Sequence, residues 1–509
     1  MLNNIKKTAR ETLKTPDLKF IKELWRDFPT AEIFLVGGLV RDAALGVTSK
    51  DVDLVVRNLP AQKLQKFLTK HGRVNLVGKR FGVFKFLPRN SSLAEPIDIA
   101  LPRTEHSLGT SAYRDFAVQS KADLPIEMDL ARRDFTINAL AWDVKNNRLV
   151  DPFGGLADLK KQRLRTVGKA KDRFTEDASR LLRALRFACQ LNFKIEKNTW
   201  RAIIKYIGLL NKKSSPTPRR RMVIGLAESG RVVPYEVIGK EIVKALVYSP
   251  ALALKLLDQS GALKRLIPEL TKTKTTTQSK KHHHEGTVWQ HTLLALQKLE
   301  SPLFKRAFPK TELNAQLVWA VLLHDIGKPA TKKRRGAVMH FYGHELKGAK
   351  LAKKICEQLK LSQYQKGSRW HLDCEHLYWL IRHHLLVILS EVKTLRASTL
   401  EKFFFNPLYP GQTLLQLMWA DMSASLRPNG RPDLTKFIAL RRRLAKMSRV
   451  KKLPPPLLTG NEVMATLNLT PGPKVGLALA WLREEQLNGR LKTKAAAFGA
   501  LKKHGHENL

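Results

Sequence analysis

Cysteine is scarce in this chain of 509 residues. Cys189, Cys356 and Cys374 are the only three, and none of them forms a CxxC pair. This pattern argues against a disulfide framework and against a structural zinc ribbon. The sequence therefore predicts a protein of the reducing cytoplasm.

Long apolar runs are lacking too. No stretch approaches the roughly 18 to 20 apolar residues that span a bilayer. The first thirty residues mix Lys6 and Lys7 with Glu11 and Glu23, unlike a signal peptide core or an acid-poor transit peptide. We therefore expect no membrane partner.

Acidic residues are few, since 44 Asp and Glu face 91 Lys and Arg, and the formal net charge is +47. Such an excess is more than solubility needs and suits a polyanionic partner such as RNA or DNA. Hydrophobic residues still make up 43% of the chain. That share, at this length, allows about two to four globular domains.

Three segments combine Pro, Ser or Thr with basic residues and interrupt the hydrophobic periodicity, namely 211–221, 271–286 and 448–456. Up to residue 150, short β-rich runs (IFLVGG, DVDLVV, FGVFKFL, IDIAL) alternate with helical segments, which is typical of an α/β arrangement. After residue 155 the composition is helical throughout. The sequence thus predicts a mixed head followed by helical domains, with 271–286 as a linker.

A glycine pair follows the first β-rich run of the head. The run IFLV at 33–36 leads into Gly37 and Gly38, and the helical segment LVRDAALG with Arg41 follows. Such a turn lets backbone N–H groups and the positive end of a helix approach a phosphate. An ordinary tight turn has the same pattern, so the glycines alone do not identify a site.

Two acids follow in the run DVDLVV. Asp51 and Asp53 alternate, so a strand would present both carboxylates on one face. Paired carboxylates can hold Mg²⁺ beside substrate phosphates. The alternative is a solvated edge strand with two exposed acids.

A third pattern lies in the run EDASRLLRALRF at 176–187. Asp177, Arg180 and Arg183 recur every three residues and would share one flank of a helix. A carboxylate beside a guanidinium offers a planar set of acceptors and donors that can read the edge of a base. The alternative is an intrahelical salt bridge on a solvated face.

Taken in order, the motifs GGLVRD, DVDLVV, RRDFTINAL, DPFGGLADL and EDASRLLRALRF resemble those of the class II tRNA nucleotidyltransferases and bacterial poly(A) polymerases. LDQSGALKRLIPEL at 257–270 and PLLTGNEVMATLNLTPGPKVG at 456–476 resemble segments of bacterial CCA-adding enzymes that carry an HD domain. The resemblance implies an α+β nucleotidyltransferase head with a mixed β-sheet and helices, followed by an all-α neck, body, HD domain and tail. The implied boundaries are 1–150 for the head, 151–215 for the neck, 216–270 for the RNA-binding body, 287–445 for the HD domain and 446–509 for the RNA-binding tail.

The resemblance also implies roles for individual residues. Asp51 and Asp53 would be catalytic and hold Mg²⁺. Asp134 would lie near the ribose, and Glu176, Asp177 and Arg180 would form the protein template that selects CTP or ATP. The residues expected to contact the incoming nucleotide are Gly38, Arg41, Arg133, Arg183 and Arg186.

Histidines and acids of the second half form another set, in the order His291, His324, Asp325, His344, His383, His384 and Asp421. A lone histidine in such apolar helical surroundings is usually part of a core, but an adjacent His-Asp pair with further His and Asp is typical of a hydrolytic metal site. The order resembles an HD phosphohydrolase domain. That implies one divalent metal, such as Ni²⁺, Mn²⁺ or Co²⁺, on His291, His324, Asp325 and Asp421. His344, His383 and His384 are candidates for a second metal or for substrate phosphate, and His282 to His284 are expected in a solvated loop.

The function expected from this resemblance is template-independent addition of C, C and A to the 3′ end of tRNA from CTP and ATP, with phosphohydrolase activity in the HD domain. Lys212, Lys213 and Arg219 to Arg221 would hold tRNA phosphates. A bacterial poly(A) polymerase is the first alternative, because LVGKRFGVFKF at 76–86 partly fits its pattern, although Lys85 departs from it. An HD phosphohydrolase with a non-catalytic RNA-binding head is the second, and a basic RNA chaperone the third. The oligomeric state is open.

Overall fold

The computed structural model describes the chain except residues 50, 78–82, 92–94, 108–115, 214–229, 336–337, 389–391, 393, 449–453 and 509. Arg219 to Arg221 and parts of the stretches 76–86 and 448–456 lie outside the described residues. The chain divides into two compact units, Met1–Leu266 and Ile267–Leu509. No helix of the described residues is long and apolar enough to cross a membrane.

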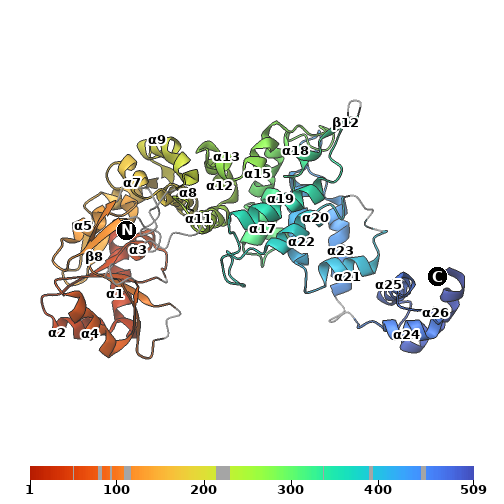
Figure 1. The fold of residues 1–509 in the computed structure, drawn as a ribbon, viewed down its shortest axis with the longest axis horizontal. Coiled ribbons are helices and arrows are strands. Elements are labelled where there is room, and N and C mark those ends of the chain that lie inside the picture. The colour runs from red at the N-terminus through yellow and green to blue at the C-terminus, as the bar shows by residue number, and fades with distance from the viewer. Residues whose placement is uncertain are drawn as a thin grey trace. The chain divides into compact units, whose positions relative to one another are not determined.

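A seven-stranded sheet lies at the centre of the first unit, in the order β3-β4-β5-β2-β1-β8-β9 (Figure 1). Its neighbouring strands are antiparallel except β2 and β5, which are parallel. The mixed sheet expected from the sequence is thus confirmed. The strands of this unit are β1 (Glu32–Val36), β2 (Asp53–Arg57), β3 (Gly72–Val77), β4 (Val83–Pro88), β5 (Ile97–Ala100), β6 (Arg103–Ser107), β7 (Phe116–Ser120), β8 (Ala141–Asp143), β9 (Arg148–Val150), β10 (Arg163–Leu164) and β11 (Lys194–Ile195).

The central strand β1 buries four successive apolar residues, from Ile33 to Val36. A strand in the middle of a sheet that is covered on both faces needs apolar side chains on both sides, so the run IFLV is continuous rather than alternating. On one face, Phe34 packs with Val55 of β2 and with Ile126 and Leu130 of α5. The helices of the head are α1 (Leu2–Lys14), η1 (Pro16–Leu18), α2 (Phe20–Asp27), α3 (Gly38–Leu45), α4 (Ala61–His71), α5 (Ile126–Ala131), η2 (Thr136–Asn138) and α6 (Gly155–Lys160).

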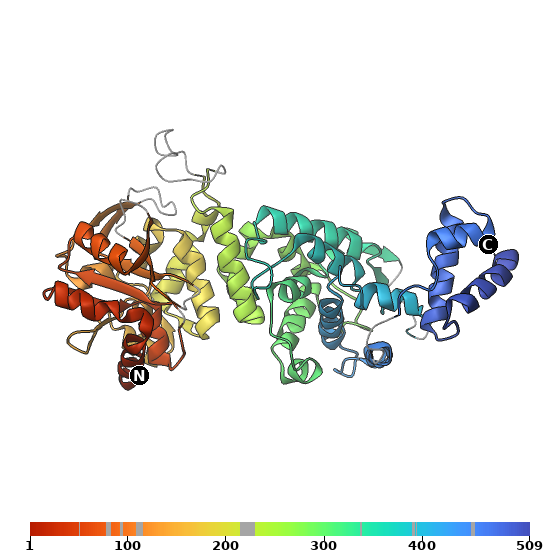
Figure 2. The same ribbon diagram turned by 90° about the horizontal axis from the view of Figure 1, so that it is seen from below.

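Helices continue the first unit beyond the sheet. The helix α8 buries an apolar stripe that includes Leu182 and Leu185, and α11 packs along it (Figures 1 and 2). These helices are α7 (Ala170–Glu176), α8 (Ser179–Leu191), α9 (Lys197–Tyr206), η3 (Ile207–Asn211), α11 (Tyr235–Tyr248), α12 (Pro250–Gln259) and α13 (Ala262–Leu266).

The second unit is helical, with one two-stranded sheet of β12 (Lys333–Arg335) and β13 (Val338–His340). This sheet and the β10–β11 pair were not expected in a region that reads as helix throughout. The central helix of the second unit, α17, is buried along nearly its whole length because α15, α20 and α22 pack around it. The helices are α14 (Pro268–Thr271), η4 (Lys272–Thr275), α15 (Val288–Leu299), α16 (Pro302–Ala307), α17 (Ala315–Leu323), α18 (Lys328–Thr331), α19 (His344–Gln358), α20 (Cys374–His383), α21 (Ala397–Phe404), α22 (Gly411–Ala424), α23 (Thr435–Ser448), α24 (Gly460–Leu467), α25 (Pro473–Leu487) and α26 (Lys494–Asn508).

The segment 271–286, expected to be a linker, packs within the second unit. Thr273, Thr276 and Gln278 are buried, and Thr277 pairs with Thr287 in a β-bridge. The polar composition misled the prediction because buried hydroxyls here are satisfied by hydrogen bonds, such as those from Thr273 and Thr276 to backbone carbonyls.

A disulfide joins Cys356 on α19 to Cys374 at the start of α20. The low cysteine count had argued against disulfides, and this single bond corrects that expectation. The two cysteines are 18 residues apart in the sequence, and they meet because α19 and α20 pack along each other. The pairing therefore depends on helix packing, which the spacing of the cysteines does not reveal.

The last three helices, α24 to α26, form a small core of their own at the blue end of the chain in Figure 2. Thr459 and Glu462 close the start of α24 with a capping box. Glu484 on α25 accepts hydrogen bonds from the backbone N–H groups of Ala397 and Ser398 at 2.8 and 2.9 Å. This carboxylate ties α25 to the start of α21.

Candidate active site and candidate metal centre

The glycine turn lies where the sequence places it, between β1 and α3. Gly37 has a positive φ of 68°, which favours glycine. A Cβ atom at this position would also lie 2.6 Å from Nη1 of Arg133. The positive φ is what favours glycine here, whereas the tip of the flexible Arg133 side chain could shift to relieve the contact.

Three carboxylates meet beside this turn. Asp53 begins β2 and lies directly opposite Asp98 of the parallel strand β5. The exposed Asp51 lies two residues earlier, before the strand rather than on it as the alternation had predicted. All three line a cavity of about 210 Å³ together with Lys85, whose Nζ lies 2.8 Å from Oδ1 of Asp98. Sequence reasoning missed Asp98, although an acid inside the apolar run IDIAL of an acid-poor chain was a usable signal.

These carboxylates repel one another. Burial, together with the charges of Asp98 and Asp51, raises the pKa of Asp53 to about 6, although Arg133 opposes the shift. A divalent cation held by these hard oxygen ligands would offset the repulsion. The residues present therefore fit Mg²⁺.

Asp53 also faces a second, basic cavity of about 450 Å³. Among its lining residues are Gly37, Gly38, Asp134 and Asp177. A guanidinium pairs bidentately with phosphate oxygens, so this lining suits a triphosphate. The arginines that line the cavity are Arg41, Arg103, Arg132, Arg133, Arg180 and Arg183.

Two buried acids hold four of these arginines in place. Asp129 pairs with Arg132 at 2.8 Å and with Arg133 at 3.3 Å. Oδ2 of Asp134 accepts two hydrogen bonds from Arg183, at 2.9 and 2.7 Å. The amide of Asn138 links Oδ1 of Asp134 to Nη1 of Arg41.

Burial disfavours ionisation of Asp134, but Arg183 and Asn138 outweigh it and hold its pKa at about 2. This carboxylate is therefore ionised and keeps Arg183 fixed.

The chain breaks its helix at Asp177, which corrects the expectation that Asp177, Arg180 and Arg183 share one helix. α7 ends at Glu176, and Asp177 is extended with φ −141° and ψ 101°. Its Oδ1 accepts the N–H of Ser179 at 2.8 Å, which caps the start of α8. Arg180 pairs with Glu176 at 2.9 Å instead, yet Asp177 and Arg180 both line the basic cavity.

Two residues of the expected nucleotide site are not among the residues that line the cavity, Glu176 and Arg186. Glu176 accepts a hydrogen bond from the guanidinium of Arg180 and so contributes indirectly. Arg186 stacks on the ring of Phe187 with its guanidinium carbon 3.6 Å from the ring centroid, and it donates a hydrogen bond to Glu241 at 2.9 Å. Phe187 itself lines the cavity.

The histidines and acids of the second unit converge from five helices. His291 lies on α15, His324 and Asp325 follow α17, and Asp421 lies on α22. Nε2 of His291 lies 3.1 Å from Oδ1 of Asp421 and 3.3 Å from Nε2 of His324. His344 and His384 complete the group from the start of α19 and the end of α20, and all six side chains are buried.

Asp325 is the centre of this cluster. Its Oδ2 lies 3.3 Å from Nε2 of His324 and 2.7 Å from Nζ of the buried Lys328. Its Oδ1 faces Nε2 of His344 at 3.4 Å and Nε2 of His384 at 3.9 Å. Within the part of the chain that the structure describes, neither of these two Nε2 atoms has a hydrogen-bond partner.

The Nε2 atoms of these histidines face into the cluster because their Nδ1 atoms form hydrogen bonds with the backbone. Nδ1 of His324, His344 and His384 each donates to a backbone carbonyl, at 2.8, 2.7 and 2.7 Å. Burial and the neighbouring imidazoles also lower the pKa of His384 to about 3, so its ring is neutral. Imidazoles with fixed tautomers and a shared carboxylate fit a divalent metal. The atoms form two such groups, which share Asp325.

A glycine allows two of the segments to meet here as well. A Cβ atom on Gly327, just after Asp325, would lie 2.1 Å from the carbonyl oxygen of His344 and 2.6 Å from the N of Gly348. Only glycine permits this approach of the His-Asp segment to α19. The cluster opens into a cavity of about 690 Å³ whose lining includes Lys328 and Arg427.

The structure does not bring His383 to this cluster. Its ring packs against Trp379 and Phe403 instead. Adjacent residues of a helix point about 100° apart, so only one of two neighbouring histidines can face the metal-type site.

His283, by contrast, was expected in a solvated loop and in fact lines the cavity. Its Nδ1 lies 2.7 Å from Oε1 of Glu285, a residue that sequence reasoning missed.

A sheet with clustered carboxylates beside an arginine-lined cavity defines a nucleotidyltransferase head, and the helical cluster defines an HD domain with candidate metal ligands. Comparison with known families agrees. The poly A polymerase head domain matches residues 33–165, and the HD domain matches residues 269–415.

An A-adding tRNA nucleotidyltransferase of Deinococcus radiodurans is 35% identical over 382 residues, which cover 73% of this chain and 78% of that protein. A multifunctional CCA protein of Azoarcus is 34% identical over 373 residues, 72% of this chain and 77% of that one. The chain therefore belongs to the tRNA nucleotidyltransferase family. A solved structure of the Thermotoga maritima CCA-adding enzyme with tRNA shares the fold, with a TM-score of 0.56 and 19% identity over 98% of this chain and 97% of that one.

Proposed function

We propose that this chain adds C, C and A to the 3′ end of tRNA, using CTP and ATP and no nucleic-acid template. The observation that carries the proposal is a single cavity that combines Asp53, Asp177 and six arginines, with Arg180 among them. The alternative functions, a poly(A) polymerase or an RNA chaperone, account for this cavity less well, because neither protein needs to select C and then A. Relatives named as CCA-adding enzymes support it.

In this proposal Asp51, Asp53 and Asp98 hold Mg²⁺. The ion supplies activation of the RNA 3′-hydroxyl and neutralises charge at the α-phosphate. Arg41, Arg133 and Arg183 bind the triphosphate, held in place by Asp129, Asp134 and Asn138. The buried acids matter because fixed arginines need no reorganisation when charge develops during transfer.

Asp177 and Arg180 select the base. Cytosine and adenine each present an amino group that donates and a neighbouring ring nitrogen that accepts, whereas guanine and uracil present a carbonyl oxygen in place of the amino group. A carboxylate beside a guanidinium is complementary to the first pair and repels the second. Glu176 supports this selection by fixing Arg180, and Arg186 acts through Phe187 rather than by direct contact.

The helical neck (151–215), body (216–270) and tail (446–509) are proposed to bind the tRNA. Lys212 and Lys213 are exposed cations in the first unit, and the chain carries a net charge of +47. Phosphate contacts of this kind hold RNA without reading its sequence, so binding should weaken steeply as salt is raised. Action on tRNA also supports the cytoplasmic location expected from the sequence.

A second activity is proposed for the HD domain (287–445), hydrolysis of phosphoesters. It rests on the buried cluster around Asp325, which opens into a cavity with two cations for a phosphate, Lys328 and Arg427. Mixed imidazole and carboxylate ligands accept Ni²⁺, Mn²⁺ or Co²⁺, and availability decides among them.

The test of the main proposal uses two acceptors, tRNA that ends at the discriminator base and tRNA that ends in CC, each with one labelled nucleotide at a time. We expect two C residues and one A on the first acceptor, one A on the second, and no further growth. Addition of A to the second acceptor alone would instead match the Deinococcus relative's name. Long A tails on unstructured RNA, with no C on tRNA, would overturn the proposal in favour of a poly(A) polymerase.

A further inference from the structure

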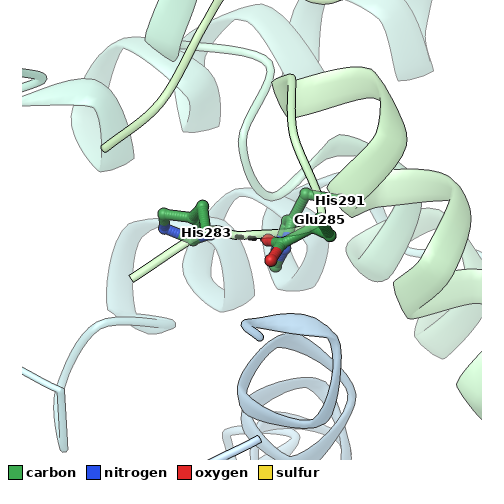
Figure 3. Close-up of side chains that lie close together, drawn as sticks. All are labelled: His283, Glu285 and His291. Atoms are coloured by element: carbon green, nitrogen blue, oxygen red, sulfur yellow. Dashed lines mark hydrogen bonds and ion pairs between the residues drawn. The ribbon is translucent and has the colours of Figure 1, made fainter. Parts of the chain in front are cut away.

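Glu285 binds three groups at once at the edge of the HD cluster. Its side chain is only 4% exposed. Oε1 accepts hydrogen bonds from Nδ1 of His283 and from Nδ1 of His291, both at 2.7 Å, and Oε2 accepts the backbone N–H of Leu426 at 2.8 Å. Figure 3 shows the carboxylate between the two imidazoles.

The bond to His291 determines which of its nitrogens can bind a metal. Because a carboxylate only accepts, Nδ1 of His291 must carry a proton, and Nε2 is the nitrogen that is left to bind a metal. That Nε2 faces Asp421 at 3.1 Å and His324 at 3.3 Å, inside the cluster. A carboxylate partner also makes the ring more basic than a carbonyl partner does, which strengthens it as a ligand.

The bond to Leu426 acts on a second member of the cluster. Leu426 lies two residues after the end of α22, the helix that carries Asp421. Its N–H is held by Glu285, and its carbonyl accepts the N–H of His284 at 2.8 Å. The segment 283–285 is thus tied to the end of α22, so that one carboxylate aligns His291 directly and Asp421 through the backbone.

We propose that Glu285 is a positioning residue of the HD site, which fixes His291 as an Nε2 ligand and holds α22 in register for Asp421. This inference rests on the proposed metal centre. The alternative hypothesis is that Glu285, His283 and His291 are ligands of a further metal. That hypothesis requires His291 to bind metals through both nitrogens and both Nδ1 atoms to lose the protons that they donate to Glu285.

The experiment measures metal affinity rather than activity. Mn²⁺ is titrated by calorimetry into the full chain after removal of metal, and Co²⁺ is added in parallel because its visible absorption reports the ligand geometry. We expect Glu285→Ala to weaken Mn²⁺ binding by about 10- to 100-fold, the usual cost of losing such a partner, and to change the Co²⁺ spectrum. Glu285→Gln keeps the size of the side chain and guards against a folding defect; it should weaken binding by a smaller factor.

Two matched controls isolate the role. Glu484→Gln removes another carboxylate of the same unit. Like Glu285 it accepts hydrogen bonds from the backbone, here from two N–H groups, but it has no imidazole partner among the described residues. Mn²⁺ affinity should therefore be unchanged. His283→Ala removes only the other imidazole on Glu285 and should leave Mn²⁺ affinity close to that of the unmodified chain.

The outcomes separate the two proposals. If the unmodified chain binds no Mn²⁺ or Co²⁺, the metal centre itself is wrong. If it binds metal and both Glu285 variants bind equally tightly with the same spectrum, the positioning role alone is overturned. Loss of one bound ion per chain in both the Glu285 and the His283 variants, with unchanged affinity for the rest, would make Glu285 a metal ligand and would also overturn it.

Discussion

The head site and the HD site handle charge in opposite ways. In the head, Asp51 is exposed and Asp53 is partly exposed, and the arginines line an open cavity. In the HD site, His291, His324 and His384 are 0% exposed and Asp325 is 2% exposed. The first arrangement leaves its charges within reach of a substrate that comes and goes, whereas the second buries them and suits an ion that stays.

The interactions that orient the side chains also differ between the two sites. Head residues are oriented by salt bridges between acids and arginines, such as Asp134 with Arg183. HD residues are oriented by hydrogen bonds from Nδ1 atoms to backbone carbonyls and to Glu285. Removing one side chain from the head should therefore change the charge of its cavity. Removing one from the HD site should change the orientation of the remaining candidate metal ligands.

The largest effect is expected from Asp53→Ala. It removes the carboxylate shared by the two cavities of the head, so incorporation of both CTP and ATP should fall by more than about a hundredfold, or roughly 2.7 kcal/mol of barrier. Phosphohydrolase activity of the same preparation should be unchanged, which serves as the folding control. Transfer above about a tenth of the original rate would contradict the assignment.

The reverse experiment is Asp325→Asn, which keeps the shape of the side chain but loses the charge shared by both groups of HD ligands. Metal-dependent hydrolysis of a phosphodiester should fall to background, with tRNA elongation retained. If the unmodified chain hydrolyses nothing with Mn²⁺, Co²⁺ or Ni²⁺, the HD domain is structural and the comparison of two active sites ends there.

The pH dependence should differ between the sites because Asp53 has a pKa near 6. Its pKa is raised, so the carboxylate is ionised above about pH 6 and protonated below, and metal binding requires the ionised form. Transfer at low Mg²⁺ should therefore decline as the pH falls through about 6. Added Mg²⁺ competes with the proton and should move this midpoint to lower pH; a midpoint that ignores Mg²⁺ would point to another group.

A smaller effect is expected on selectivity. Asp177→Asn replaces an acceptor by a partial donor next to Arg180, so discrimination of CTP and ATP against UTP and GTP should shrink by about tenfold, close to 1.4 kcal/mol. Rates with each of the four nucleotides measure it. Glu196→Gln, which alters the cap of α9 in the same neck and away from the cavity lining, is the matched control; equal loss of selectivity in both variants would mean a general disturbance of the neck.

The smallest effect is expected from His383→Ala, and its neighbour His384 provides the contrast. His384→Ala should abolish metal-dependent hydrolysis, but His383→Ala should leave it unchanged and cost only about 1 kcal/mol of stability, from lost packing against Trp379 and Phe403. Hydrolysis assays and thermal melting of both variants test this. A loss of hydrolysis in His383→Ala would place that ring at the site after all.

The sequence was informative wherever a function depends on neighbours in the chain. The run IFLV with its glycine pair and the His324-Asp325 pair lie where the patterns placed them, because a strand, a tight turn and a helix end are local structures. The alternation of Asp51 and Asp53 was less reliable, since β2 begins only at Asp53 and Asp51 lies before the strand. Even the family was readable, since its motifs keep their order and spacing.

Tertiary structure alone decided the rest. Asp98 meets Asp53 through a strand pairing between residues 45 positions apart, and Glu285 reaches Leu426 across 141 positions. Cys356 and Cys374 pair because two helices lie together, and His384 rather than His383 faces Asp325 because the helix end points one ring inward. Local composition carries no record of such pairings, since they are fixed by the packing of whole elements and not by the chain between them.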